Sequence, residues 1–470
     1  MSDTKKSEKI KELEQLLESK RENYGKTVSA EESAESTAFA ENFKDFLNKS
    51  KTEREAVTTA VAYATGAGFV PFDATATYRP GDKVYAVNRG KAVTLAVFGK
   101  RSVAEGVRII AAHMDAPRID LKPAPVYEDN GIAYFKTHYY GGIKKYQWTA
   151  LPLALHGVAV LKNGASVTVS IGESEDEPAL VITDLLPHLA DKQMNRKARE
   201  IIRGEELNAV AATLPYRDGD DAGSVKLNLL NILYNKYGIT EADFVSSEFE
   251  LVPALKARDV GLDRSLVGAY GQDDRVCSYA ALMAAAALEV PEYTSVIALT
   301  DKEEIGSDGP TGLASRYLEY FINDLSDLDK VAVRKVLSKS ECLSADVSAA
   351  FDPTFPDVLE KNNAAYLGGG PCLMKYSGSR GKAGTNDADA EFVGKVRSIF
   401  DRAGVPFQVC ELGKVDEGGG GTVAKYVSAL DVNTVDLGVP LLSMHAPFEL
   451  ASKLDIWNTY KAFAAFLRGA

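Results

Sequence analysis

Two hydrophobic periodicities alternate along the chain and divide it into three stretches. Up to residue 117, runs with an apolar face at helical spacing precede short runs of β-forming residues. Residues 118–257 are dominated by β-forming runs and turns, and the alternation of helical and β-like runs resumes over 258–470. The expected helices are 5–20, 38–47, 53–67, 276–288, 311–326, 386–403, a helix opened by glycines 418–421 and running to 430, and 448–468. The expected strands are 83–88, 92–99, 106–112, 131–140, 157–161, 166–171, 294–300, 341–350, 373–376, 432–437 and 440–444.

This pattern predicts two domains, because 470 residues are too many for one ordinary domain. Residues 1–117 and 258–470 are expected to form one α/β domain. Residues 118–257 are expected to form a second, β-rich domain inserted into the first and used for assembly. The insert also contains His138, His156 and His188, and the residues alone favour packed or surface positions for all three.

Composition narrows the classes of protein that remain. A hydrophobic fraction of 45% is that of a globular protein with a full core, and a net charge of -12 argues against nucleic acid or anionic membrane partners. Four cysteines without a CxxC spacing fit a reducing compartment. Neither an apolar signal-peptide core nor a run long enough to span a bilayer is present, so the expected location is the cytoplasm.

Two acidic doublets stand at the two ends of one predicted helix–strand unit. Asp273 and Asp274 come just before the helix 276–288, and Glu303 and Glu304 follow the strand 294–300. A helix that packs back on its sheet brings its N-terminus near the carboxyl ends of the strands, where open α/β sheets place their ligands. Four carboxylates there would repel one another. A pair of divalent metal ions would neutralise them.

A histidine and an aspartate end another apolar run. The run 109–112 leads directly into His113-Met114-Asp115. In a strand, residues i and i+2 face the same way, so the Asp115 carboxylate can meet the His113 ring. A carboxylate that accepts the second imidazole N–H fixes the tautomer and makes the ring a better metal ligand. The alternative is a strand end with a solvated histidine and aspartate.

Two further residues belong to the same inventory. Asp346 lies in the middle of the apolar run 341–350 and needs a partner there, which a metal, an arginine or a turn could supply. His445 follows the run 440–444. Two histidines and several carboxylates suit zinc, with cobalt or manganese in its place. In such a two-metal site one carboxylate often bridges the ions, and a free glutamate beside a ligand glutamate can act as general base.

Taken together, these motifs resemble one family. They occur in the order His113-Met114-Asp115-Ala116-Pro117, Gln272-Asp273-Asp274-Arg275, Glu303-Glu304-Ile305-Gly306, Ser344-Ala345-Asp346-Val347, and Val435-Asp436-Leu437-Gly438 leading to Ser443-Met444-His445. Over almost its whole length the chain resembles the aspartyl aminopeptidase and aminopeptidase I family of dinuclear zinc exopeptidases. Within the wider clan of co-catalytic metallopeptidases, the long insert with residues 139–143 and 187–190 points to this family.

The resemblance implies a fold and an assembly. The expected fold is the zinc-exopeptidase α/β/α sandwich, interrupted by a β-rich dimerisation domain. Such dimers resemble those that build a closed tetrahedral dodecamer, which would admit small peptides but not folded proteins.

The resemblance also implies roles at the site. The expected ligands form two sets that share one aspartate, with His113, Asp273 and Asp346 on one ion and Asp273, Glu304 and His445 on the other. Glu303 would be the general base, Asp115 would orient His113, and the Asp273–Asp274 peptide bond would be cis. The implied reaction is removal of N-terminal amino acids from peptides by an attacking water.

Substrate preference is the part of the resemblance that the sequence modifies. Lys375 matches a strand lysine that would pair with an acidic side chain, and His188 resembles a histidine that reaches the partner subunit's active site. The tract 378–385 departs from aspartyl enzymes by carrying Lys382-Ala383, so the expected N-terminal residue is acidic or neutral. Two alternatives are a related amidohydrolase, such as a deacylase or carboxypeptidase, and a non-catalytic assembly protein, against which the presence of Glu303 argues.

Overall fold

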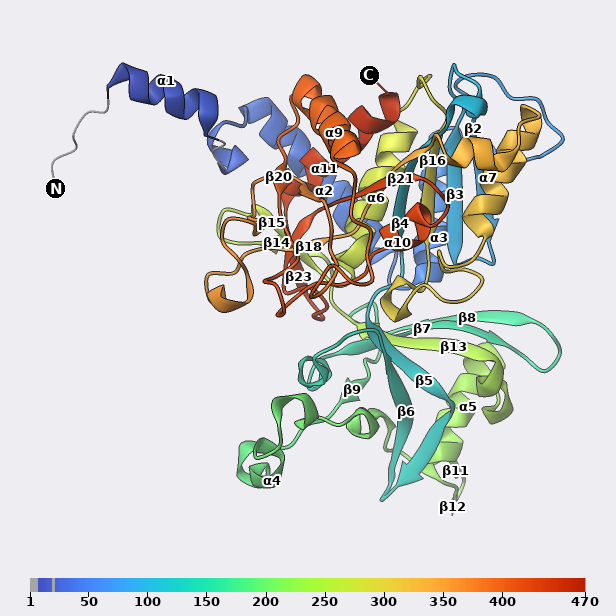
Figure 1. Ribbon diagram of the computed structural model, residues 1–470. Helices are drawn as coiled ribbons and strands as arrows, with labels where there is room; N and C mark the ends of the chain where they lie inside the picture. The colour runs from blue at the N-terminus through green and yellow to red at the C-terminus, as the bar shows by residue number, and fades with distance from the viewer. Residues whose placement is uncertain (1–6, 19–21, 470) are drawn as a thin grey trace.

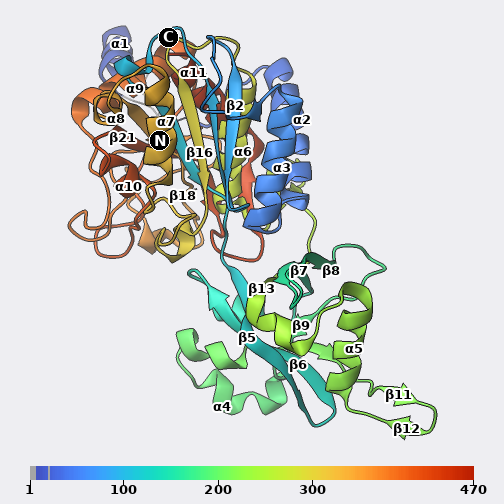
Figure 2. The ribbon, with the colours of Figure 1, turned by 90° about the vertical axis from the view of Figure 1, so that its right-hand side faces the viewer.

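The computed structural model describes residues 7–18 and 22–469, which form two lobes joined at a narrow waist (Figure 1 and Figure 2). The upper lobe in Figure 1 holds a nine-stranded sheet and the lower lobe a seven-stranded sheet. The chain enters the lower lobe through β5 (Arg118–Asp129) and leaves it through β13 (Ser247–Pro253). The lower lobe is therefore an insertion in the upper one.

The nine-stranded sheet carries its parallel strands at the centre. It consists of β1 (Val70–Pro71), β2 (Lys83–Asn88), β3 (Ala92–Val97), β4 (Arg108–His113), β16 (Ser295–Thr300), β17 (Glu341–Ser344), β19 (Cys372–Met374), β20 (Gln408–Val409) and β21 (Asn433–Gly438). The order is β1-β2-β3-β16-β4-β17-β21-β19-β20. Strands β16, β4, β17 and β21 run parallel, so their carboxyl ends meet at one edge, the edge where such sheets bind ligands.

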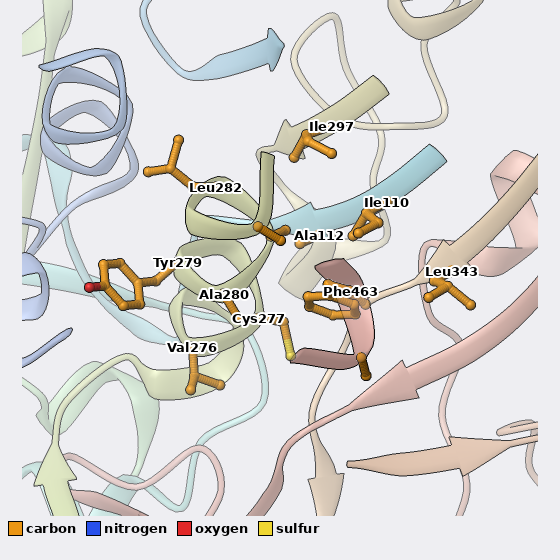
Figure 3. Packing of buried hydrophobic residues seen from close by; sticks show 14 of the residues in the cluster. Ile110, Ala112, Val276, Cys277, Tyr279, Ala280, Leu282, Ile297, Leu343 and Phe463 are labelled. Carbon is orange, nitrogen blue, oxygen red and sulfur yellow. The ribbon is translucent and has the colours of Figure 1, made fainter. Parts of the chain in front are cut away.

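Helices cover both faces of this sheet. One face packs against α2 (Ala30–Asn48), α3 (Glu53–Gly66), α6 (Gln272–Ala286), α9 (Ala390–Ala403) and α11 (Lys453–Arg468), and the other against α7 (Tyr317–Leu328), α8 (Val333–Leu337) and α10 (Ala424–Ser428). In β4, Ile110 and Ala112 point to the first group and Ile109 and Ala111 to the second, as the two-residue repeat of a strand requires. Figure 3 shows α6 packed beside β4 and Phe463 of α11. The upper lobe is an α/β/α sandwich.

A small five-stranded sheet extends the upper lobe at the edge where the parallel strands β17 and β21 end. Its order is β14-β15-β23-β22-β18. Its strands are β14 (Arg258–Val260), β15 (Leu266–Ala269), β18 (Ser348–Ala349), β22 (Pro440–Leu442) and β23 (Glu449–Ser452). The turn between β22 and β23 contains His445, so this sheet fixes one histidine of the predicted site.

The inserted lobe has its own sheet and core. Its remaining elements are β6 (Ile132–Tyr140), β7 (Leu153–Val160), β8 (Ser166–Ile171), β9 (Val181–Ile182), β10 (Ala209–Ala212), the hairpin β11 (Arg217–Asp218) and β12 (Asp221–Ala222), α4 (Asp191–Met194) and α5 (Val225–Tyr237). The sheet order is β8-β7-β13-β5-β6-β10-β9. Trp148, Phe135 and Phe244 are buried in a core separate from that of the upper lobe.

Several boundaries differ from the sequence predictions. The run 341–350 is split between β17 and β18, which belong to different sheets, and Asp346 lies in the link between them. The predicted helix 448–468 begins as strand β23 and becomes helical only at Lys453. Helix α7 starts at Tyr317 instead of residue 311, because the Thr311 hydroxyl donates a hydrogen bond to Asp301 and ties that segment to the end of β16.

Other differences concern helices. Glycines 418–421 precede a short helix, α10, that starts only at Ala424. Helix α5 is absent from the sequence prediction. Of the predicted helix 5–20, the structure describes α1 (Glu8–Leu17), and residues 5, 6, 19 and 20 lie outside the described residues. Across 7–18 and 22–469, no helix has both the length and the apolar character needed to cross a bilayer.

Candidate metal centre

The predicted site residues meet where the parallel strands end. His113 is the last residue of β4, Glu303 and Glu304 form a short turn after β16, and Asp346 follows β17. Asp273 lies in the distorted first turn of α6, where the Asp273–Asp274 peptide bond is cis, as the resemblance implies. The convergence arises because the parallel strands deliver their carboxyl ends to the same edge.

His113 is 1% exposed and uses its two ring nitrogens differently. Its Nδ1 lies 3.1 Å from the backbone oxygen of Asp115 and 3.3 Å from the Asp115 carboxylate. Its Nε2 lies 3.3 Å from Asp273 and 3.8 Å from Asp346, in each case from a carboxylate oxygen. The predicted pairing of Asp115 with the His113 ring is thus present in the geometry.

His445 makes the same kind of contacts and faces the other carboxylate oxygen of Asp273. Its Nδ1 lies 2.7 Å from the backbone oxygen of Gly142, and its Nε2 lies 3.1 Å from Asp273 Oδ2 and 3.6 Å from Glu304 Oε1. The backbone of His445 has a φ of 64°, in the left-handed region that residues other than glycine rarely adopt. Its amide N–H donates to Glu449, which holds the turn in this conformation.

The ring nitrogens define where a cation can bind. Each Nδ1 faces a carbonyl oxygen, which only accepts hydrogen bonds, so Nδ1 carries the proton of the neutral ring. Each Nε2 then presents a lone pair to carboxylate oxygens, which are also acceptors. A cation bound between Nε2 and the carboxylate oxygens would give all of these acceptor atoms a partner. Ligand atoms of a tetrahedral zinc site with bonds of about 2.1 Å stand about 3.4 Å apart, which is the spacing found here.

Two groups of side chains could each hold such an ion and share Asp273. They are His113, Asp273 and Asp346, and Asp273, Glu304 and His445, and within each group the candidate ligand atoms lie within 4.8 Å of one another. A third group of this kind, His113 with Glu303 and Glu304, overlaps the first two. A buried oxygen of Glu304, Oε1, has no hydrogen-bond partner among the described residues, as expected of an atom that binds a metal ion.

Electrostatics point the same way. Burial and Asp273 raise the pKa of Glu304 well above its usual value, and burial and Asp346 raise the pKa of Glu303 to about 8. Burial opposes protonation of His445, but Asp273 and Glu304 raise its pKa to about 11. These shifts express an excess of negative charge in a small buried volume, which divalent cations would neutralise.

Asp115 contacts both His113 and the turn that carries Glu303 and Glu304. It is fully buried. Its Oδ1 accepts from the backbone N–H of Glu303 at 3.1 Å, and its Oδ2 accepts from that of Glu304 at 3.2 Å. Together with the His113 contact, these bonds fix the ring and the glutamate turn relative to each other.

Sequence reasoning missed two residues at the centre. Glu449 accepts from the backbone N–H groups of Gln272, Asp273 and His445 at 2.7, 3.2 and 2.8 Å. Tyr140 donates to Asp115 at 2.8 Å. The spacing of four residues from His445 to Glu449 was a signal for the first, but the apolar run around it predicted a helix. Tyr140 has no local signal, because its partner belongs to the other lobe.

A cavity of about 330 Å³ opens beside the two glutamates of the centre. Glu303 and Glu304 form part of its wall, and Lys425 and Tyr426 line it from α10. The Tyr426 hydroxyl donates to the backbone oxygen of Gly306 and so ties α10 to the turn that carries both glutamates. Lys425 brings a positive charge to the space next to Glu303.

Two predicted substrate residues lie outside this cluster. Lys375 is exposed and follows β19, and it does not line the cavity beside Glu303. His188 is exposed in a short 3₁₀ turn (Pro187–Leu189) of the inserted lobe. Neither residue is among the groups that could hold a metal ion in the described part of the chain.

Comparison with known proteins assigns the chain to a family. Residues 46–467 match the family described as aminopeptidase I zinc metalloprotease (M18). A probable M18 family aminopeptidase 1 of Clostridium acetobutylicum is 47% identical over 438 residues, covering 92% of this chain and 94% of the relative.

Solved structures agree. The crystal structure of an M18 family aminopeptidase from Thermotoga maritima superposes with a TM-score of 0.92 at 43% identity, over 96% of this chain and all of that one. Aminopeptidase I from Clostridium acetobutylicum gives 0.90 at 44% identity with the same coverage. A yeast aminopeptidase solved as a dodecamer shares the fold at 23% identity, with a TM-score of 0.73 over 91% of this chain and 95% of that one.

These matches confirm the predicted family and the predicted α/β fold class. They also confirm that the chain is a hydrolase that acts as a peptidase. The family match spans residues 46–467 of this chain, and relatives named aminopeptidases align over nearly their whole lengths. The chain therefore belongs to the aminopeptidase I family of zinc metalloproteases.

Proposed function

We propose that this aminopeptidase uses two divalent metal ions, with zinc the expected metal and cobalt or manganese able to replace it. One ion would be held by His113, Asp273 and Asp346, and the other by Asp273, Glu304 and His445. The observation that carries the proposal is the pair of histidine Nε2 atoms that face the two carboxylate oxygens of Asp273, at 3.3 and 3.1 Å. A single carboxylate between two such nitrogens is what a bridging ligand requires.

Glu303 is the proposed general base. Its side chain stands next to the ligand Glu304, yet it remains 16% exposed, whereas Glu304 is 4% exposed. When bound, the metal ions lower the pKa of a coordinated water and polarise the scissile carbonyl. Glu303 takes a proton from the attacking water and returns it to the leaving amine.

The substrate's N-terminal side chain is proposed to enter the cavity beside Glu303. Lys425 lines this cavity and favours an acidic side chain, while the family resemblance gives that role to Lys375. The neutral glycine-rich part of the wall, which includes Gly384 and Gly421, is compatible with an uncharged side chain. The proposed substrates are therefore small peptides with an acidic or neutral N-terminal residue.

The inserted lobe is proposed to mediate self-association into dimers that can build a tetrahedral dodecamer. Its segment 185–194 exposes Leu185, Leu186, Leu189 and Met194, each at least half exposed, around His188. An apolar cluster of this kind is typical of a protein–protein contact. His188 would then lie at the interface and reach the partner subunit's active site. Cys277, Cys342 and Cys372 are buried free thiols, which supports a reducing, cytoplasmic location.

The test measures hydrolysis of Asp-, Glu- and Leu-p-nitroanilide before chelation, after chelation, and after return of zinc or cobalt. Glu303→Gln should bind zinc like the unmodified protein and lose about 10²- to 10⁴-fold in kcat. Lys375→Met and Lys425→Met should each lower kcat/KM for the acidic substrates more than for Leu-p-nitroanilide. If neither lysine variant changed the ratio of kcat/KM for the acidic substrates to kcat/KM for Leu-p-nitroanilide, these lysines would not pair with an acidic side chain.

Acylated substrates separate the proposal from the amidohydrolase alternative. An aminopeptidase needs the free α-amine, so N-acetyl-Asp- or N-acetyl-Leu-p-nitroanilide should not be cleaved. Release from blocked substrates alone, with zinc bound, would instead indicate a deacylase. A Glu303→Gln variant as active as the unmodified protein would remove Glu303 from the role of base.

A further inference from the structure

The loop that leaves β6 is the place where the inserted lobe meets the metal centre. Tyr140 is the last residue of β6, and Gly141 and Gly142 follow it. The Tyr140 hydroxyl donates to Asp115, whose carboxylate contacts Nδ1 of His113. Gly142 contacts Nδ1 of His445 through its backbone oxygen. One short segment therefore contacts, directly or through Asp115, the nitrogen that faces away from Asp273 in both histidines.

Tyr140 completes the set of contacts that immobilises Asp115. The Asp115 Oδ1 atom accepts from the Glu303 backbone N–H and faces the His113 ring, and Oδ2 accepts from the Glu304 backbone N–H. The Tyr140 hydroxyl is the second partner of Oδ2. Asp115 is fully buried, so water cannot readily replace this hydroxyl. Removing it would leave Oδ2 held by one donor and loosen the histidine and the glutamate turn together.

The two glycines let the loop approach the ligands closely. Gly141 has a φ of +73°, and a Cβ there would lie 3.3 Å from Glu304 Oε2. A Cβ on Gly142 would lie 3.4 Å from His445 Nδ1. The Gly141 contact is tighter than an ordinary van der Waals separation and its positive φ favours glycine, so a side chain there would press on a proposed metal ligand. The Gly142 separation is an ordinary van der Waals contact, so the absence of a side chain matters at Gly141.

The position of Tyr140 is fixed from inside the inserted lobe and from the upper lobe. It pairs with Arg118 across strands β5 and β6, and the guanidinium carbon of Arg118 lies 3.8 Å from the centroid of its ring. Arg118 in turn pairs with Glu250 of β13 at 3.1 Å and with Glu53 of α3 at 3.5 Å. The phenol is thus anchored by charged groups from both lobes and is 8% exposed.

We propose that Tyr140 is a positioning residue, and that the segment 140–142 of the inserted lobe sets how tightly the centre holds its metal ions. This inference rests on the proposed function, because it takes His113 and His445 as metal ligands. Groups that accept or share the second imidazole N–H orient the ring and tune its affinity for metal, and their loss typically weakens metal binding by 10- to 100-fold.

The experiment compares Tyr140→Phe with Tyr139→Phe in the full-length protein. Both substitutions remove one phenol hydroxyl, but Tyr139 is 40% exposed and points to the other face of β6. Zinc affinity is measured by competition with a chromophoric chelator. Visible absorption of the cobalt-loaded protein reports ligand geometry, and the melting temperature of the chelated protein reports the fold.

Tyr140→Phe is expected to bind zinc about 10- to 100-fold more weakly and to change the cobalt spectrum, while Tyr139→Phe matches the unmodified protein. Should Tyr140→Phe not fold, Gly141→Ala, which sets a methyl group 3.3 Å from Glu304 Oε2 at a φ of +73°, is expected to weaken zinc binding in the same way. Equal zinc affinity in the two tyrosine variants would overturn the positioning role. An unmodified protein that binds no zinc would overturn the proposed metal centre itself.

Discussion

At the scale of single residues, the two histidines of the centre and His156 show how neighbouring acceptors set the protonation of an imidazole ring. In His113 and His445, Nδ1 faces a carbonyl oxygen, so a neutral ring turns its lone pair toward the carboxylates. In His156 both nitrogens face carboxylates, Glu55 at 2.7 Å and Glu173 at 3.1 Å. As an imidazolium that ring can donate to both carboxylates, so its own charge offsets theirs.

Glu449 gives the first prediction, because its carboxylate accepts from three backbone N–H groups around the centre. In Glu449→Gln the amide NH₂ must face at least one of these donors, and a buried N–H left without an acceptor costs about 1–3 kcal/mol. We expect a lower melting temperature and weaker zinc binding, because the turn that carries His445 loses its support. Thermal unfolding and chelator competition measure both effects.

Glu391→Gln is the matched control for this prediction. It removes the same charge from an exposed position in the first turn of α9. Its zinc affinity and melting temperature should stay close to those of the unmodified protein. If Glu449→Gln behaved like this control, the hydrogen bonds of Glu449 would not be what holds the centre together.

At the scale of elements, the sequence predicted best those strands whose pattern is local. The predicted strand 83–88 coincides with β2, and 166–171 coincides with β8. Buried parallel strands such as β4 and β16 were also found, because each is a short apolar run bounded by turn residues. Their common edge is what allowed the metal site to be predicted from separated motifs.

The elements that were missed depend on contacts that the local pattern does not contain. Strand β23 was read as the start of a helix, although its pairing with β15 and β22 makes it extended. Helix α5 buries only Val225, Leu229 and Leu233. Its other apolar residues are exposed or only partly buried, so its apolar periodicity is weak. Tyr140 and Glu449 could not be predicted for the same reason, since each acquires its role from partners distant in sequence.

The core of the upper lobe gives a prediction at this scale. Phe463 of α11 is fully buried against α6 and the central sheet (Figure 3). Phe463→Ala removes its contacts and leaves a cavity, which costs about 3–5 kcal/mol of stability. We expect a clear fall in the unfolding midpoint in urea, with Arg468→Ala, at the exposed end of the same helix, as control. Equal midpoints would show that α11 is not part of the cooperative core.

At the scale of the whole molecule, charged side chains join the two lobes. Arg118 of the insert pairs with Glu53 of α3, and Arg54 of α3 pairs with Glu248 of β13. The His156 cluster adds Glu55 of α3 on one side and Glu173 of the insert on the other, with Lys51 and Lys256 at 3.8 and 2.9 Å from Glu173. Because the segment 140–142 reaches the proposed metal centre across the same boundary, the lobes must keep a fixed relation for the centre to stay intact.

The final prediction concerns the pH range over which this boundary is stable. Burial opposes charging of His156, but Glu173 and Glu55 raise its pKa from 6.5 to about 9. A raised pKa means that the folded state holds the proton more tightly than the unfolded state. The stabilisation is complete below about pH 6.5 and is lost as the pH rises through 9, and at most it amounts to roughly 3 kcal/mol. Burial likewise opposes ionisation of Glu173, but His156, Lys51 and Lys256 lower its pKa from 4.5 to about 2. Its contribution is therefore complete above about pH 4.5 and is lost as the pH falls through 2.

Replacing the ring by an uncharged side chain tests this directly. The difference in melting temperature between the unmodified protein and His156→Gln should be largest near pH 6 and should shrink steadily toward pH 10, because only the unmodified protein loses the imidazolium. His138→Gln, at an exposed position in the same lobe, should show no such trend. A difference that stayed constant from pH 6 to 10 would mean that His156 supports the boundary by packing alone, and the lobes would then be held together by the arginine–glutamate pairs, whose charges persist throughout this range.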